Sequence, residues 1–327
     1  MPLMNVLQAV NETLKQEMRR DDRVVVFGED VGHEGGVFRA TVDLQKEFGK
    51  DRCMDTPLAE SGIVGVGIGM GLNGLIPVVE IQFMGFVYPA FNQIITHVAR
   101  MRNRSRGRYT VPMTIRMPYG GGIRALEHHS ESTEALFAHI PGLKVVVPST
   151  PYDTKGLLAS AIRDEDPVIF LEPKRIYRAF KQEVPEEEYL IPIGKAKVVK
   201  EGEDITIISW GASMREVLKA TEMAEGKGIY PEVIDLRTIA PIDRETVIQS
   251  VKKTGRVLIV HEAPKTGGVG GELISIINEK AFLHLEAPPS RLTGFDTVFP
   301  LPKGEHHYIP SPERILKKIT ETVNYLT

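Results

Sequence analysis

The feature that most limits the fold of this chain is a repeated alternation of short β-rich runs with helical stretches. A buried strand is predicted at residues 23–30 (RVVVFGED), and another at 75–83 (LIPVVEIQF) precedes a helix at 89–103 that Pro89 opens. Residues 142–173 then read as strand, loop, helix and strand. Such alternation is typical of a parallel sheet with helices on both faces. The sequence therefore predicts an α/β fold with mainly parallel sheets flanked by helices.

A break in this alternation divides the chain into two domains. Residues 179–194 (AFKQEVPEEEYLIPIG) contain an acidic triplet and two prolines, and they show no clear period. The alternation resumes with a strand at 204–210 (DITIISW). At 327 residues the chain is long for one core, since a domain commonly holds roughly 150 residues. We therefore place a boundary between a domain of residues 1–187 and a domain of residues 188–327.

Composition and charge exclude several classes of function. The formal net charge of −3 and the pI near 6.3 give no electrostatic footprint for nucleic acid or for an anionic membrane. The basic run 100–108 (RMRNRSRGR) is interpreted as a solvated or subunit-facing helix end. Residues 1–18 have the pattern of an amphipathic helix and not of a signal peptide. Because the only cysteine is Cys53, no internal disulfide can form, and we predict a cytoplasmic protein.

A glycine-rich stretch at residues 55–74 (DTPLAESGIVGVGIGMGLNG) allows more than one interpretation. Residues 69–74 match the dinucleotide-binding pattern GxGxxG, but that pattern follows a strand and opens a helix, whereas here a strand follows it. A nicotinamide site is therefore not expected. Glycines four residues apart instead leave one face of a helix without side chains. This pattern predicts close packing against another helix, of this chain or of a second subunit. A second glycine run, 266–273 (TGGVGGEL), lacks the Walker lysine and is interpreted as a tight strand-to-helix connection.

Glu60 stands immediately before these glycines, near the start of the predicted helix. One interpretation is a first-turn carboxylate that the helix dipole favours, which is a common arrangement. The other is a carboxylate held in a buried, glycine-lined wall, where it would hydrogen-bond a heterocyclic nitrogen and shift its protonation.

Two adjacent histidines, His128 and His129, follow the glycine triplet 120–122. Metal binding is weakly supported, because no cysteine or nearby third imidazole completes a tetrahedral zinc site. The glycines predict a mobile loop, and residues 130–140 (SESTEALFAHI) are expected to form a helix with a serine or threonine cap. Catalytic groups often lie on such loops at strand ends, so His129 is a candidate acid or base.

Six runs extend over nearly the whole chain and carry a resemblance to a known family: GEDVGHEGGVFRAT, DTPLAESGIVGVGIGMGLNGLIPVVEIQF, PAFNQI, HHSESTEALFAHIPGLKVVVPSTPYDTKGLL, DPVIFLEPKRIYR and VIDLRTIAPID. They resemble the beta subunits of the thiamine-dependent, decarboxylating component of 2-oxo acid dehydrogenase complexes, a group that includes pyruvate, branched-chain 2-oxo acid and acetoin dehydrogenases. The resemblance implies a thiamine pyrimidine-binding domain followed by a transketolase C-terminal-like domain. It also implies an α2β2 heterotetramer that docks on a dihydrolipoyl acyltransferase core.

The resemblance further implies roles for individual residues. A glutamate at the position of Glu60 contacts N1′ of the aminopyrimidine of thiamine diphosphate and activates it, and an aromatic residue at the position of Phe86 lies against that ring. His129 matches the histidine of the family's HSQS run and would assist proton transfer. Here the run reads HSES, so Glu131 replaces the usual glutamine, and His128 stands where an aromatic residue is frequent. The family's structural potassium ion would be held, mainly through backbone oxygens, by Met113, Ala161, Ile162, Asp164 and Asp166.

The sequence contains no counterpart of the magnesium and diphosphate motif found in related single-chain enzymes, a GDG run followed downstream by an asparagine. Mg²⁺ requires such oxygen ligands. We therefore expect this chain to hold half of the cofactor site and an alpha subunit to hold the magnesium and the diphosphate. The expected activity is oxidative decarboxylation of a 2-oxo acid, with transfer of the acyl group to a lipoyl group. The alternatives are a noncatalytic structural or docking subunit and, less favoured by length and motif, sugar chemistry of the transketolase type.

Overall fold

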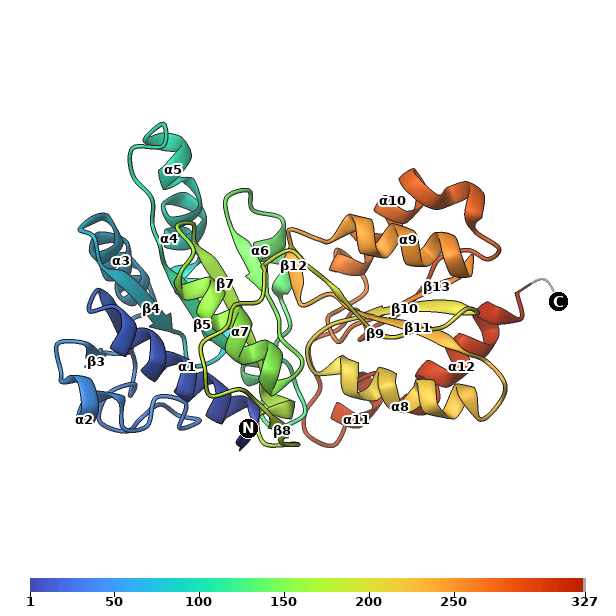
Figure 1. Ribbon diagram of the computed structural model, residues 1–327, viewed down its shortest axis with the longest axis horizontal. Coiled ribbons are helices and arrows are strands. Elements are labelled where there is room, and N and C mark those ends of the chain that lie inside the picture. The colour runs from blue at the N-terminus through green and yellow to red at the C-terminus, as the bar shows by residue number, and fades with distance from the viewer. Residues whose placement is uncertain (326–327) are drawn as a thin grey trace.

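The computed structural model describes residues 1–325 and contains two helix-covered sheets that lie side by side (Figure 1). The larger sheet has seven strands, in the spatial order β12 (Thr238–Ala240), β6 (Lys144–Val146), β7 (Val168–Pro173), β5 (Thr114–Tyr119), β4 (Ile76–Glu80), β2 (Val24–Gly28) and β3 (Cys53–Asp55). The smaller sheet has five, in the order β14 (Ser290–Leu292), β13 (Val257–Val260), β10 (Ile205–Ser209), β11 (Pro231–Asp235) and β9 (Lys197–Lys200). Neighbouring strands are parallel except β12 with β6 and β9 with β11. The predicted α/β fold with mainly parallel sheets is confirmed.

Strand β2 illustrates why helices cover both faces of the larger sheet. Val25 and Phe27 belong to the apolar cluster on one face, and Val24 and Val26 belong to the cluster on the other. Successive side chains of a strand point to opposite faces, so a strand that is apolar throughout must be covered twice. The first face is covered by α3 (Glu60–Leu72), α4 (Tyr88–Thr96) and α6 (Glu134–Ala138), and the second by α1 (Val6–Arg20), α2 (Leu44–Phe48) and α7 (Pro151–Ile162).

The smaller sheet is covered in the same way. One face packs against α8 (Ser213–Glu225) and α12 (Pro312–Val323), and the other packs against α9 (Arg244–Thr254) and α10 (Val269–Ala281). The run 266–273 leads from β13 into α10, so the predicted strand-to-helix connection is confirmed. The remaining short elements are a ribbon of β1 (Leu3–Met4) with β8 (Gln182–Glu183), α5 (Met101–Arg104), α11 (Glu305–Tyr308) and the 3₁₀ turns η1 (Met84–Phe86), η2 (Val98–Arg100), η3 (Glu127–His129), η4 (Lys174–Ile176) and η5 (Phe282–His284). No helix within residues 1–325 is both long and apolar enough to cross a membrane.

The glycine-rich helix exists as α3, but its glycines do not form the single helix-packing face that the spacing predicts. Gly67 lies against Met113 and Val79, and Gly71 lies against Val111, so these glycines let the helix approach the sheet. Gly65 has no neighbouring atom within 4 Å of the position where a Cβ would stand. The prediction of helix–helix packing is therefore wrong for the buried glycines, because residues of the sheet and of the segment that leads into β5 occupy the space beside them. Packing of the open glycine face against a second subunit stays a prediction.

The helix expected over residues 130–140 is much shorter than its sequence pattern indicates. The chain instead forms the turn η3, and the helix α6 begins only at Glu134. Thr133 stands at the N-cap, but its side chain makes no capping hydrogen bond. The expected helix start was wrong because residues 130–133 belong to the loop that follows β5, where Ser130 Oγ donates to the Leu126 carbonyl oxygen at 3.0 Å.

A buried group of three charged side chains joins the central strands of the larger sheet. Arg116 of β5 donates from Nη1 to Glu80 Oε2 at 2.8 Å, and it donates from Nε to Glu172 Oε1 at 2.6 Å. Arg116 is 1% exposed and both carboxylates are buried. Glu80 lies directly opposite Arg116 in the ladder of β4 and β5. Burial raises the pKa of Glu80, although the positive charge of Arg116 acts to lower it. One guanidinium therefore holds two buried carboxylates and fixes the relation of three strands.

Removal of the guanidinium should destabilise the chain strongly. In the variant Arg116→Met the two carboxylates lose their partner in the interior, and we expect the free energy of unfolding to fall by about 3–5 kcal/mol. Urea unfolding followed by circular dichroism measures this change. The matched control is Arg102→Met, which removes a half-exposed guanidinium paired with Asp166 and Glu165 and should cost less than about 1 kcal/mol. Equal losses in the two variants would contradict the structural role of the buried group.

The two domains meet through one apolar cluster and through buried polar contacts. The cluster that includes the α3 and α4 face continues into the face covered by α9 and α10. Trp210, which follows β10, donates from Nε1 to Glu134 Oε1 of α6 at 3.3 Å and stacks on His261 with ring centroids 5.2 Å apart. Burial raises the pKa of Glu134 to about 7. This carboxyl group therefore holds its proton in the folded chain at a pH where an exposed glutamate is ionised.

The raised pKa of Glu134 should make the stability of the folded chain depend on pH. Between the unfolded pKa of about 4.3 and the folded value of about 7, the folded chain binds the proton and the unfolded chain does not. The stability contributed by this proton is present at low pH and is lost as the pH rises through that window. The variant Glu134→Gln does not lose this stability, because its side chain does not titrate. The free energy of unfolding of the variant relative to the parent should therefore be about 2.5 kcal/mol larger at pH 8 than at pH 5. Urea unfolding at the two pH values tests this, and a gain that is independent of pH would overturn it.

Candidate functional site

Glu60, Phe86 and His129 all lie after the carboxyl ends of parallel strands in the larger sheet. Glu60 opens α3 after β3, Phe86 ends η1 after β4, and His129 ends η3 after β5. Ligands of open α/β sheets bind at this edge, because the loops that leave parallel strands converge there. Ser61 Oγ donates a short hydrogen bond to the Pro89 carbonyl oxygen, which ties the start of α3 to the start of α4 directly after η1.

Phe86 and His129 belong to one cluster of rings. The His129 ring lies edge-on to Phe86 with centroids 5.1 Å apart and edge-on to Phe83 at 4.6 Å. Nδ1 of His129 is buried and has no hydrogen-bond partner among the residues that the structure describes. Gly85 makes this approach possible, because a Cβ at that position would overlap the His128 carbonyl oxygen. The structure thus brings Phe86 and His129 together and leaves one imidazole nitrogen without a partner.

Glu60 occupies the first turn of α3 with 9% of its surface exposed. None of the hydrogen bonds and ion pairs found within residues 1–325 involves its carboxylate. The neighbouring carboxylate Glu29 has a raised pKa, first because of its burial and then because of the charges of Asp30 and Glu60. The Glu60 oxygens are not among the fully buried atoms that lack a partner, so the carboxylate reaches solvent at this edge of the sheet and is free to accept a hydrogen bond from a bound molecule. Position in the first turn is also what the helix dipole favours, so the structure retains both interpretations of this residue.

The two departures from the family pattern lie at the edge of the same ring cluster. Tyr88 Oη donates a short hydrogen bond to Glu131 Oε2, and burial raises the pKa of Glu131. The exposed His128 ring lies 6.3 Å from the Tyr88 ring and 6.4 Å from the Phe86 ring. Tyr88 was not singled out from the sequence. Tyr88 stands directly before the helix-opening proline and two residues after Phe86. This position is the only local signal in the sequence that it belongs to this region.

The glycine triplet 120–122 is not the free loop that its composition predicts. A Cβ on Gly121 would overlap the Phe299 ring, and a Cβ on Gly122 would overlap the Arg175 side chain. Gly121 N also donates a short hydrogen bond to Glu262 Oε1. The triplet lacks side chains because Arg175, together with Glu262 and Phe299 of the C-terminal domain, packs against its backbone.

The five residues of the potassium prediction lie around the end of α7 and the starts of β5 and β7. Their carboxylates already have partners: Lys144 Nζ lies 2.6 Å from Asp164 Oδ2, and Arg102 Nε lies 2.6 Å from Asp166 Oδ1. Met113 O accepts from Val168 N at 2.9 Å, so these segments are in direct contact. A cation at this corner would therefore rely on backbone oxygens of Met113, Ala161, Ile162, Asp164 and Asp166. Within residues 1–325 no group of three or more His, Cys, Asp or Glu side chains is arranged to hold a metal ion.

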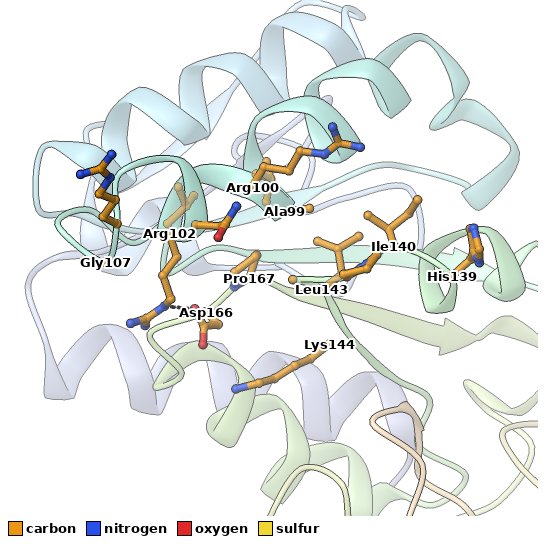
Figure 2. Close-up of a pocket in the computed structure, with 16 residues that line it drawn as sticks. Ala99, Arg100, Arg102, Gly107, His139, Ile140, Leu143, Lys144, Asp166 and Pro167 are labelled. Atoms are coloured by element: carbon orange, nitrogen blue, oxygen red, sulfur yellow. Dashed lines mark hydrogen bonds and ion pairs between the residues drawn. The ribbon is translucent and has the colours of Figure 1, made fainter. Parts of the chain in front are cut away.

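One cavity lies near the basic run and away from the ring cluster. It has a volume of about 1110 Å³ and is lined by residues of η2, α5 and the segments around β6, among them Arg100, Arg102 and Lys144 (Figure 2). Figure 2 shows that Arg100 points away from Arg102, whose guanidinium turns to Asp166. The basic groups do not converge on one point, so this cavity lacks the character of an anion site. Glu60, Phe86 and His129 are not among its lining residues.

Comparisons with known proteins agree with this architecture. The sequence matches two family descriptions, "Transketolase, pyrimidine binding domain" over residues 3–179 and "Transketolase, C-terminal domain" over residues 194–315. A solved structure described as a split-gene transketolase, inactive beta4 tetramer, superposes with a TM-score of 0.80 at 21% identity, covering 98% of both chains. This likeness supports the fold alone. The predicted boundary at residue 187 falls in the gap between the two matches and stays a prediction.

Sequence relatives are much closer. The chain is 61% identical over 315 residues to the pyruvate dehydrogenase E1 component subunit beta of Acholeplasma laidlawii, with 96% of each chain covered. It is 53% identical over 325 residues to the protein of the same description from Bacillus subtilis strain 168, covering 99% of this chain and 100% of the relative. The resemblance inferred from the sequence runs is thereby confirmed. The chain belongs to the family of E1 beta subunits of 2-oxo acid dehydrogenase complexes.

Proposed function

We propose that this chain is the catalytic beta subunit of a pyruvate dehydrogenase, which oxidatively decarboxylates the 2-oxo acid with thiamine diphosphate and transfers the acyl group to the lipoyl group of a dihydrolipoyl acyltransferase. The observation that carries the proposal is the placement of Glu60, whose carboxylate has no hydrogen-bond donor among the described residues, at the same sheet edge as Phe86 and His129. Pyruvate is chosen as the substrate because the relatives at 61% and 53% identity are described as pyruvate dehydrogenase subunits.

The side chains at this edge suit the pyrimidine half of the cofactor. When bound, thiamine diphosphate supplies a carbon nucleophile whose formation depends on the protonation of its aminopyrimidine. Glu60 would accept a hydrogen bond from the protonated ring nitrogen N1′, which would satisfy the carboxylate. Phe86 would pack its half-buried ring against the heterocycle. His129 would exchange a proton with the reacting groups through its imidazole ring.

The other half of the site would come from a second protein. We infer that an alpha subunit holds Mg²⁺ and the diphosphate in an α2β2 heterotetramer, since this chain has no motif of oxygen ligands for the ion. A structural K⁺ bound by backbone oxygens of Met113, Ala161, Ile162, Asp164 and Asp166 stays a prediction, as does a cytoplasmic location. The assembled enzyme would dock on the acyltransferase core.

Substitution of Glu60 separates the catalytic role from the helix-dipole role. In the assembled enzyme, Glu60→Ala should lower kcat for pyruvate decarboxylation by roughly 100- to 10,000-fold, the range for loss of a positioned acid–base group. The matched control is Glu245→Ala, because Glu245 is an exposed glutamate in the first turn of α9. If the dipole were the only role, both variants would change stability slightly and leave kcat unchanged. Full activity of the Glu60 variant would also favour a noncatalytic subunit.

Dependence on the alpha subunit is tested by reconstitution. The chain is purified alone and after co-expression with its alpha partner, and decarboxylation of pyruvate, a branched-chain 2-oxo acid and 2-oxoglutarate is measured by release of carbon dioxide. We expect activity only in the co-expressed sample, with pyruvate preferred. Full activity of the isolated chain would show that the site is complete without a partner, and preference for another 2-oxo acid would overturn the substrate assignment.

A further inference from the structure

We propose that Glu262 is a positioning residue, a carboxylate from the C-terminal domain that clamps the loop carrying His129. This role rests on the proton-transfer function proposed above for His129. The loop runs from Gly120, directly after β5, to Ser132, shortly before α6. No sequence motif singled out Glu262, which directly follows β13 and His261.

The two ends of this loop are joined by a backbone hydrogen bond. Gly120 N donates to the Glu131 carbonyl oxygen at 2.8 Å, and we call this junction, with the adjacent Gly121 and Ser132, the neck of the loop. Inside it, His129 N donates to the Leu126 carbonyl oxygen at 3.0 Å and forms the turn η3. The position of His129 therefore depends on where the neck is held.

Glu262 holds both sides of that neck with a single oxygen atom. Its Oε1 accepts the short hydrogen bond from Gly121 N and a second one from Ser132 Oγ at 3.4 Å. Glu262 is 6% exposed, so water competes little for these bonds. Gly120 has a φ of +81°, and a Cβ there would stand 3.1 Å from Glu262 Oε1. Glycine at 120 thus permits both the backbone turn and the close approach of the carboxylate.

Lys174 connects the clamp with the ring cluster. Its Nζ donates a short hydrogen bond to the Gly120 carbonyl oxygen and lies 5.8 Å from the centroid of Phe83, whose ring is edge-on to His129. Burial lowers the pKa of Lys174 to about 7, and the charge of Glu262 opposes this shift. Arg175 Nη2 lies 3.5 Å from Glu262 Oε2 and supplies a further countercharge. The contacts therefore run without interruption from the C-terminal domain to the imidazole.

A second contact from the C-terminal domain supports the outer part of the loop. Arg124 N donates to Glu305 Oε2 of α11 at 3.0 Å. Arg124 itself is exposed and has a φ of +58°. It offers a trypsin site within the loop, so cleavage there reports how often the loop opens.

Three variants in the assembled αβ enzyme test the clamp. Glu262→Ala removes the acceptor and should lower kcat/KM by roughly 10- to 100-fold, as expected when a catalytic group is misplaced. Glu262→Gln keeps an acceptor oxygen and should lose at most about fivefold, because a neutral hydrogen bond is roughly half as strong as a charge-assisted one. The control Glu216→Ala removes the other carboxylate paired with Arg175. Glu216 makes no hydrogen bond or ion pair with the described residues of the loop, so kcat/KM should stay unchanged.

Two readouts without bound cofactor separate positioning from chemistry. In Glu262→Ala, amide hydrogen exchange across residues 120–132 and tryptic cleavage at Arg124 should both accelerate at least about tenfold, while exchange in β2 and β10 stays at the parent level. Glu262→Gln and Glu216→Ala should resemble the parent protein. If Glu262→Ala does not fold, Glu262→Asp, whose shorter side chain withdraws the oxygen from the neck, takes its place with the same expectations.

Unchanged exchange and cleavage in the Ala or Asp variant would overturn the clamp, as would a Gln variant as defective as Ala. Failure of the proposed function has a different signature. The parent enzyme would then decarboxylate no 2-oxo acid, whereas the exchange and cleavage measurements would still decide whether Glu262 holds the loop.

Discussion

The contact of Arg116 with Glu80 and Glu172 is the interaction on which the rest of this structure depends. It joins β4, β5 and β7 at the centre of the larger sheet, and a shift of one residue in any of these strands would turn a charge to the opposite, apolar face. Tyr177 adds a hydrogen bond from Oη to Glu172 Oε2 at 2.6 Å. Replacing such a group by apolar side chains is often neutral for stability, so its contribution here is to select one strand register. That register determines where η1 and η3 leave the sheet, and with them Phe86 and His129.

The candidate site is built from few direct contacts between its members. Glu60, Phe86 and His129 come from three separate loops, and each is positioned by its own neighbours: Ser61 with Pro89, Gly85 with the His128 backbone, and the neck of the loop after β5. This arrangement leaves polar atoms of Glu60 and His129 available to a bound molecule. It also makes the site depend on the C-terminal domain, because Glu262 and Trp210 contact the segment between Gly121 and Glu134.

Local pattern and family resemblance together predicted the fold class and the central strands, and they named three site residues whose roles stay predictions. The strands were predictable because uninterrupted apolar runs such as 24–28 leave few alternatives. The helix expected at 130–140 and the packing expected for the buried glycines of α3 were wrong, because contacts distant in sequence decide both. Glu262 and Lys174 were not found, since an isolated charged residue after a strand resembles any loop residue. A charge inside each of three buried strands was a usable signal for the group around Arg116, although sequence alone does not show that the strands are neighbours.

Strand β12 crosses the predicted domain boundary and completes the sheet of the other domain. It comes from the C-terminal half of the chain, yet it pairs with β6 and forms the outermost strand on that side of the larger sheet. A fragment that stopped at residue 187 would present β6 with unpaired backbone groups, which is the kind of exposed edge that recruits other chains into aggregates. The C-terminal half of the chain thus supplies the last strand of the N-terminal sheet. Synthesis of the chain must proceed past Ala240 before the larger sheet can gain its last strand, so the folding of the first half depends on the second.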